Sequence, residues 1–337
     1  MRTLLVAAAA VMMSAPALAN DTMSVLGAGG LVFVTNEQIA MESEDLSISK
    51  EEVKVVYQFR NKSDEDQHIL VAFPMPDIQG SGNFMVGIPT EDPDNIFGFT
   101  TTFDGQPVDA TLHQYAFAAG IDQSELLREL GVPLAPFGEK TIEALNALGD
   151  ADKKRLLELG LAFPMEYDSG DGWRIDLNPA WTLRSTYSWE ATFPAGKPVE
   201  VVHTYKPSVG GTVGVVFLAE PYGDYDPATA YQKKYCTDEN FAKAVRKTLT
   251  NPDDVYSAPF TETWLSYIWS TGGNWSGPIG TFTLTVDKGR PENLVSFCGE
   301  NVEKIGPTTF RMTAKDFFPP WDRELDILIL ERNDPSN

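Results

Sequence analysis

The chain has 337 residues, with 48 Asp and Glu against 26 Lys and Arg, and a formal net charge of −22. So acidic a surface repels phosphate backbones and anionic headgroups, which disfavours nucleic acid as a partner. The length suits two domains better than a single sandwich.

The N-terminus has the order of a secretory signal peptide. An uncharged run from Leu4 follows one arginine and ends in the sequence ALA at 17–19, a typical cleavage site. The run is shorter than the roughly 20 residues that span a bilayer. The sequence therefore predicts that residues 1–19 are a signal peptide, cleaved between Ala19 and Asn20, and that the mature chain is periplasmic. No later segment is apolar enough to be a transmembrane segment.

Alternation of apolar and polar residues dominates the chain, and every second residue from Val53 to Phe59 is apolar. This period of two is typical of a strand with one face on a core. Similar runs occur at 69–73, 187–193, 199–205, 282–286 and 325–329. Many short strands separated by Gly, Pro and Asn turns predict a mainly β protein built from two Ig-like β-sandwich domains.

Two stretches have helical spacing instead. Residues 122–160 contain leucines at helical intervals with glycine stops, which predicts a small helical insertion in the first sandwich. Residues near 227–249 predict one or two short helices in the second. The Pro- and Gly-rich sequence after residue 210 places the boundary there, so the expected domains are 20–210 and 211–337.

The chain contains two cysteines, Cys236 and Cys298. In an oxidising compartment an isolated pair favours a structural disulfide. A C-x-x-C motif, typical of redox chemistry, is absent from the sequence.

Metal and cofactor motifs are weak. The histidines, His68, His113 and His203, lie far apart, and the cysteines are assigned to the disulfide, so a zinc site is disfavoured. The acidic segments 91–95 and 168–176 lack the alternating pattern of a calcium loop and are better interpreted as solvated turns. No metal and no cofactor are expected.

The most unusual local composition is at 264–280, where three tryptophans accompany a tyrosine and several glycines. Tyr267, Trp269 and Trp275 are the candidate ligand-binding residues, because aromatic rings beside flexible glycines can stack on a sugar or a peptide. The alternative, which we favour, is that Trp264 and Trp269 fill a core and Trp275 anchors a hairpin loop.

Six stretches carry the clearest motifs of the chain: AMESEDLSIS (40–49), VVYQFRN (55–61), FPMPDI (73–78), SWEATFPAGKPVEVVHTYKPSVGG (188–211), YIWSTGGNWSGPIGTFTLTVDKG (267–289) and LVSFCGE (294–300). Together they resemble the bacterial family known as domain of unknown function 4424. The resemblance implies an exported bacterial protein of about this length and fold, with no established activity and no catalytic residues to carry over. A shorter stretch, FRNKSDEDQHILVAFPMP, is similar to a VIT-type β-sandwich.

These features favour a non-enzymatic module of the cell envelope that binds an envelope protein or a small ligand. The alternative class is a hydrolase that acts on cell-envelope glycan or peptide. A deep cleft lined by carboxylates would favour the hydrolase, and a shallow aromatic surface would favour the binding module.

Overall fold

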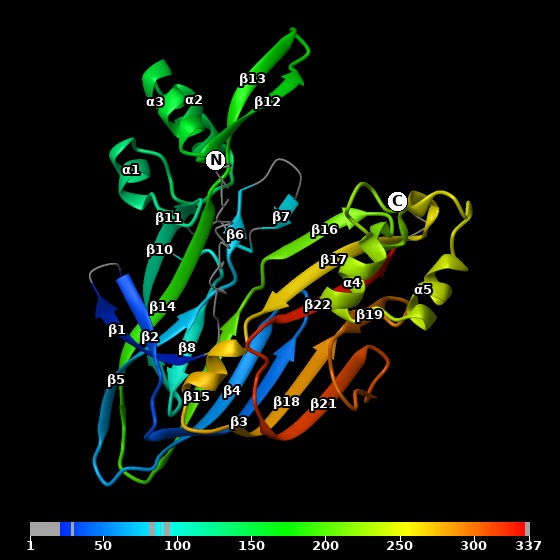
Figure 1. Ribbon diagram of the computed structural model, residues 1–337. Helices are drawn as coiled ribbons and strands as arrows, with labels where there is room; N and C mark the ends of the chain where they lie inside the picture. The colour runs from blue at the N-terminus through cyan, green and yellow to red at the C-terminus, as the bar shows by residue number, and fades with distance from the viewer. Residues whose placement is uncertain (1–20, 28–29, 81–84, 88, 91–94, 334–337) are drawn as a thin grey trace, which may run out of the picture.

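The computed structural model describes residues 21–27, 30–80, 85–87, 89–90 and 95–333 (Figure 1). The predicted signal peptide, residues 1–19, lies outside the described residues. Strands dominate, which confirms the mainly β class, and they form four sheets in the part of the chain that the structure describes.

An eight-stranded sheet forms one layer of the molecule. Alternate residues of its strands are buried, as in β4, where Val53, Val55, Tyr57 and Phe59 are on the core face. The opposite face is mostly polar, with Lys54, Gln58 and Arg60 on β4. In order across the sheet, the strands are β20 (Glu303–Lys304), β21 (Thr309–Phe317), β18 (Ile279–Asp287), β3 (Ile39–Ile48), β4 (Val53–Asn61), β15 (Pro198–Tyr205), β8 (Thr100–Phe103) and β9 (Gln106–Val108).

A second sheet packs on the core face of this layer. Its central strands, β14 and β5, contribute Trp189, Phe193, Val71 and Phe73 to the shared core. Its strands are β11 (Ile121–Asp122), β10 (Thr111–Ala118), β14 (Thr182–Phe193), β5 (Gln67–Pro74), β1 (Thr22–Gly27) and β2 (Gly30–Val34), with β6 (Ile78–Gln79) pairing to β14.

A five-stranded sheet lies between the same core and two helices. Strand β22 is buried on both faces, because Ile327 packs on the common core while Leu328 packs under α4 (Pro227–Tyr235) and α5 (Glu239–Arg246). Both helices lie within the expected 227–249. The strands are β19 (Leu294–Phe297), β22 (Leu325–Arg332), β17 (Phe260–Tyr267), β16 (Val209–Val213) and β7 (Met85–Gly87). Three short 3-10 helices accompany them: η1 (Val216–Leu218), η2 (Val255–Ser257) and η3 (Ser270–Asn274).

Two separate Ig-like sandwiches are not confirmed. Strand β18 pairs in parallel with β3, and β16 pairs with β7, so strands from both sides of residue 211 share sheets. One core cluster runs through all three large sheets. Alternation in a sequence shows which face of a strand is buried, but it does not show which distant strand is its neighbour.

An insertion projects from the end of the β10–β14 hairpin (Figure 1). It contains α1 (Ser124–Glu129), α2 (Glu139–Ala147) and α3 (Asp150–Glu158), all within the expected 122–160. It continues into a two-stranded sheet of β12 (Ala162–Asp168) and β13 (Trp173–Pro179), which the sequence did not predict. Within the described residues, no helix is long and apolar enough to cross a membrane.

Candidate functional site

The three aromatic residues singled out in the sequence are buried. Trp269 donates a hydrogen bond from Nε1 to the Arg323 carbonyl at 3.0 Å, and Trp275 donates one to the Asp21 carbonyl at 2.6 Å. The Tyr267 hydroxyl lies 3.1 Å from that of Tyr57. All three belong to the shared core, so the structure brings them together as packing and not as a stacking platform on the surface.

A groove of about 300 Å³ is lined by residues from both sides of residue 211. It opens between the segment that carries β6, the outer face of β17 and the C-terminal end of α4. Ligand pockets usually start near this size. The groove is lined by Pro76, Asp77, Ile78, Gln79, Ser208, Gly210, Lys234, Tyr235, Trp264, Leu265, Ser266 and Asp326.

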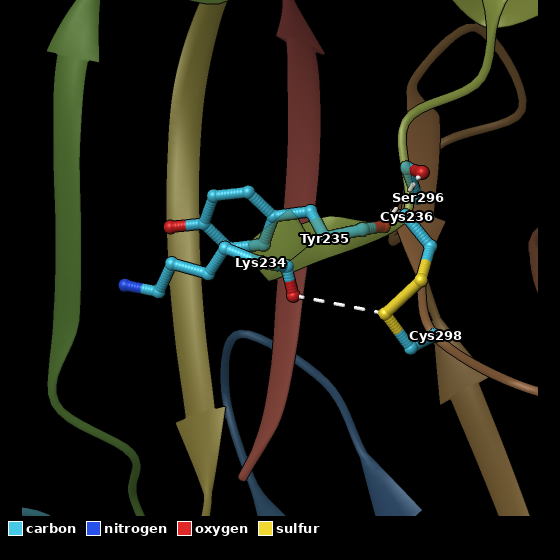
Figure 2. Close-up of a disulfide and its surroundings, with 5 residues drawn as sticks. All are labelled: Lys234, Tyr235, Cys236, Ser296 and Cys298. Atoms are coloured by element: carbon cyan, nitrogen blue, oxygen red, sulfur yellow. Dashed lines mark hydrogen bonds between the residues drawn. A yellow bond between two sulfur atoms is a disulfide. The ribbon is translucent and has the colours of Figure 1, made fainter. Parts of the chain in front are cut away.

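The disulfide holds one wall of the groove. Helix α4 begins at Pro227, after an Asp226 side chain that accepts a hydrogen bond from the Ala228 amide, and it ends at Cys236 in a left-handed conformation. Cys236 is bonded to Cys298 beyond β19, as the sequence predicted. Figure 2 shows the side chains of Lys234 and Tyr235 extending from this point across β22 and β17.

Two further contacts fix the end of α4 to β19. Ser296 donates a hydrogen bond to the Tyr235 carbonyl at 2.9 Å, and the Sγ atom of Cys298 lies 3.8 Å from the Lys234 carbonyl oxygen (Figure 2). The backbone of both groove residues is therefore positioned by a covalent link and by a hydrogen bond.

Charges of both signs line the groove. The Lys234 Nζ lies 3.7 Å from Asp326 Oδ1, and Ser266 donates a hydrogen bond to the same oxygen at 2.7 Å. Burial raises the pKa of Asp326, and Lys234 opposes the rise. Burial likewise raises the pKa of Asp77, although Arg184 approaches its Oδ2 at 3.3 Å. Each carboxylate thus has one cationic neighbour.

Trp264 supplies an aromatic wall. It is half-buried on β17, on the face opposite Leu265, and its Nε1 donates a hydrogen bond to buried Glu262 at 3.1 Å. Gly210 on β16 lies beside it, and a Cβ there would come within 3.1 Å of the indole. A side chain at this position would require the indole to shift by a few tenths of an ångström.

The buried carboxylate of Glu262 positions the Trp264 indole through this hydrogen bond. The same carboxylate also accepts hydrogen bonds from the Tyr231 hydroxyl at 2.6 Å and the Phe217 amide at 3.2 Å. Burial raises the pKa of Glu262, which these bonds oppose. The indole, α4 and η1 are therefore linked through one carboxylate.

Other hollows of the described residues offer less chemistry. One of about 160 Å³ between α4 and α5 is small for a ligand. One of about 400 Å³ beside His68 lies on two neighbouring strands, and one of about 420 Å³ beside Tyr187 has Asp109 as its charged lining residue. The groove combines both charge signs with aromatic rings, so it is the candidate site.

Sequence reasoning considered Trp264 for a core and did not connect it to the groove. The signal was present, because Trp264 and Tyr267 lie three apart on one strand and so face opposite sides. Asp77, Lys234 and Asp326 carry no local motif. Of the acidic turns, residues 91–94 lie outside the described residues, and 168–176 forms the tip of the β12–β13 hairpin. Within the described part of the chain, no group of three or more His, Cys, Asp or Glu residues could hold a metal ion.

Comparisons with known proteins give a family and remote structural likenesses. No curated protein matches the sequence. A structure from Legionella pneumophila, provisionally described as a nutrient binding protein, has 15% identity and a TM-score of 0.46 over 93% of this chain and 70% of its own. The M1 zinc metallopeptidase of Deinococcus radiodurans has 9% identity and a TM-score of 0.26 over 88% of this chain and 43% of its own. Neither likeness carries an argument about function. The family model described as Domain of unknown function (DUF4424) matches residues 19–328, and the chain therefore belongs to this family, as its motifs predicted.

Proposed function

We propose that the protein is an exported, non-enzymatic binding module of the cell envelope, and that its groove holds a small zwitterionic ligand with an apolar part. The observation that carries the proposal is the meeting of Lys234, Asp326 and Trp264 in one hollow. An amino acid or short peptide matches all three, because it carries a carboxylate, an ammonium and a side chain.

The charge arrangement supports a zwitterion. The Lys234 side chain is 54% exposed, and at 3.7 Å its contact with Asp326 is longer than a strong charge-assisted hydrogen bond. A ligand carboxylate can therefore approach Lys234, while the ligand ammonium approaches Asp326. The Asp326 side chain is only 17% exposed, and burial raises its pKa. The indole of Trp264 offers an apolar surface to the rest of the ligand.

The same contacts favour binding over glycoside hydrolysis. A glycosidase uses one protonated acid and one carboxylate on either side of the scissile bond. In the groove, Asp77 is paired with Arg184, and Asp326 is paired with Lys234 and Ser266. These cations and the hydroxyl oppose the rise in both pKa values, which is unfavourable for a general acid.

Calorimetric titration tests the proposal with phenylalanine, N-acetylphenylalanine, which lacks the ammonium, and phenethylamine, which lacks the carboxylate. We expect phenylalanine to bind best, and Asp326→Asn to weaken its binding about tenfold, the loss expected for a charged hydrogen bond. Glu158→Gln, on the exposed face of α3, is the matched control and should leave binding unchanged. Equal binding of all three compounds, or no binding of any, would exclude a zwitterion site. Chromatography of a dipeptide after incubation checks for cleavage, which would support the hydrolase.

Export is tested separately. The signal-peptide pattern at 1–19 supports it, and a disulfide suits an oxidising compartment. We expect the protein in the osmotic-shock fraction with an intact mass that begins at Asn20. A mass that retains residues 1–19 would contradict cleavage.

A further inference from the structure

The β12–β13 hairpin projects beyond the three helices of the insertion and pairs with no other described strand (Figure 1). Its base is firmly held. Leu177 is buried against the helices, and Asn146 of α2 forms two hydrogen bonds with the Leu177 backbone, at 2.8 and 3.0 Å. A two-stranded hairpin is marginally stable alone, so this support keeps it formed.

The tip of the hairpin is also ordered by its own contacts. The Ser169 amide donates to the Gly172 carbonyl at 3.0 Å, and the Gly170 amide donates to Asp168 Oδ1 at 2.9 Å. Tyr167 on one strand donates to Asp176 on the other at 2.6 Å. The hairpin is therefore a preformed element and does not need a partner in order to fold.

One face of the hairpin exposes large apolar side chains. Trp173 is 73% exposed and Ile175 is 65% exposed, and their spacing of two places them on the same face. Acidic residues lie directly across the strands, since Asp168 pairs with Trp173 and Glu166 pairs with Ile175. The face is an apolar strip bordered by carboxylates, and the hairpin as a whole carries four acids against one arginine.

We propose that this face docks an extended segment of another protein. Every second residue of that segment faces the hairpin, and these facing residues include both apolar and Lys or Arg side chains. Apolar side chains of that segment would cover Trp173 and Ile175, and its cations would meet Glu166 and Asp168. An exposed indole also attracts cations through its ring face. The outer edges of both strands carry unpaired backbone groups, to which an extended segment can add by strand pairing.

The charge argues against two other occupants. A second copy of the chain would bring another protein of net charge −22 to an acidic hairpin. An anionic lipid surface would be repelled by the same carboxylates. A basic polypeptide segment is the occupant that the charges attract.

The probe is the fluorescein-labelled octapeptide VSKSVSKS, titrated with the mature protein by fluorescence polarisation. In an extended conformation its valines and lysines share one face. The control peptide VKSSVKSS has the same composition but places its valines and lysines on opposite faces. We expect saturable binding of the VSKSVSKS peptide that weakens with salt. Trp173→Ala and Glu166→Lys should each weaken it at least about tenfold, as for a central contact residue.

Trp321→Ala is the matched control, because Trp321, in the loop before β22, is an exposed tryptophan (83%, against 73% for Trp173). The affinity of the Trp321→Ala variant for the peptide should stay unchanged, and all variants should keep the melting temperature of the parent protein. The proposal is overturned if the VSKSVSKS peptide does not bind, if the VKSSVKSS peptide binds equally, or if Trp321→Ala weakens binding as much as Trp173→Ala. It is also overturned if Trp173 mediates a dimer in sedimentation or binds anionic vesicles.

Discussion

Asp21 and His203 form a buried pair in which Asp21 Oδ1 lies 3.0 Å from His203 Nε2, and neither side chain is exposed. The pair joins the start of the described chain to β15 in the eight-stranded sheet. Rings of Phe73, Phe99 and Trp189 surround the imidazole, with centroids 4.8 to 5.2 Å away. The environment is therefore apolar, which makes the ionised carboxylate costly.

Burial raises the pKa of Asp21, and His203 opposes the rise. A carboxyl with a raised pKa stabilises the fold most below its unfolded pKa of about 4, and this contribution is lost as pH rises through the folded pKa. We expect Asp21→Asn, which mimics the protonated acid, to flatten the fall in the free energy of unfolding between acid and neutral pH. Urea unfolding at several pH values measures this slope, and an unchanged slope would contradict the assignment.

Glu331 provides the opposite case. Burial alone would raise its pKa, but hydrogen bonds from Lys50 and Thr263 outweigh burial and lower it. The contribution of ionised Glu331 to the free energy of unfolding is present above its unfolded pKa, and it is lost as pH falls through its lower folded pKa. Glu331→Gln should therefore destabilise the protein at neutral pH and have little effect in acid. A loss of stability that is the same at acid and neutral pH would count against the ion pair between Lys50 and Glu331.

Trp275 should behave as a core residue. Its ring centroid lies 4.7 Å from that of Phe59, and its indole nitrogen is hydrogen-bonded. Trp275→Ala should cost about 3–5 kcal/mol, as for a buried aromatic side chain. Trp321→Ala, at an exposed position, should change stability by less than about 0.5 kcal/mol. Chemical denaturation of both variants checks the contrast, and similar values for the two would refute it.

The disulfide should contribute to stability and to the groove. It closes a separation of 62 residues, for which chain entropy predicts about 4 kcal/mol. Replacing both Cys236 and Cys298 by Ser should lower the free energy of unfolding by roughly 2–4 kcal/mol. Because Lys234 and Tyr235 immediately precede Cys236, ligand affinity should fall as well. A destabilised variant that still binds phenylalanine normally would show that the disulfide does not position this wall.

The insertion should be dispensable for folding. Phe117 pairs with Thr182, so a two-residue Asn-Gly turn in place of residues 119–180 keeps the β10–β14 register. The helices have a separate hydrophobic cluster, although Leu134 also contacts the main core. We expect a less stable protein with one cooperative transition and a circular dichroism spectrum richer in β-structure. Unfolded or insoluble material would show that the insertion is part of the core.

The strands were largely predictable because burial follows alternation, as in β4 and β15. Strand β3 shows where simple alternation fails. A bulge between Met41 and Ser43 shifts the register, so Glu44 faces the core and accepts a hydrogen bond from Tyr267. In the sequence, the buried apolar residues of this strand fall at odd positions up to Met41 and at even positions from Leu46, and this change marks the bulge.

The candidate site was less predictable than the strands. Its residues lie between 76 and 326 in the sequence, and they meet only because β6, β17, β22 and α4 converge. No spacing rule connects such residues. The disulfide was predictable from compartment chemistry, but its effect on Lys234 and Tyr235 depends on where α4 ends.

Fluorine NMR of protein labelled with 5-fluorotryptophan places a ligand directly. Trp264→Phe assigns the Trp264 resonance, and Trp321 serves as an exposed reference. On titration with phenylalanine we expect the Trp264 resonance to shift to saturation, the Trp321 resonance to stay in place, and the shift to disappear in Asp326→Asn. A Trp264 resonance that does not move while phenylalanine binds, or that moves equally in Asp326→Asn, would contradict a zwitterion site in the groove.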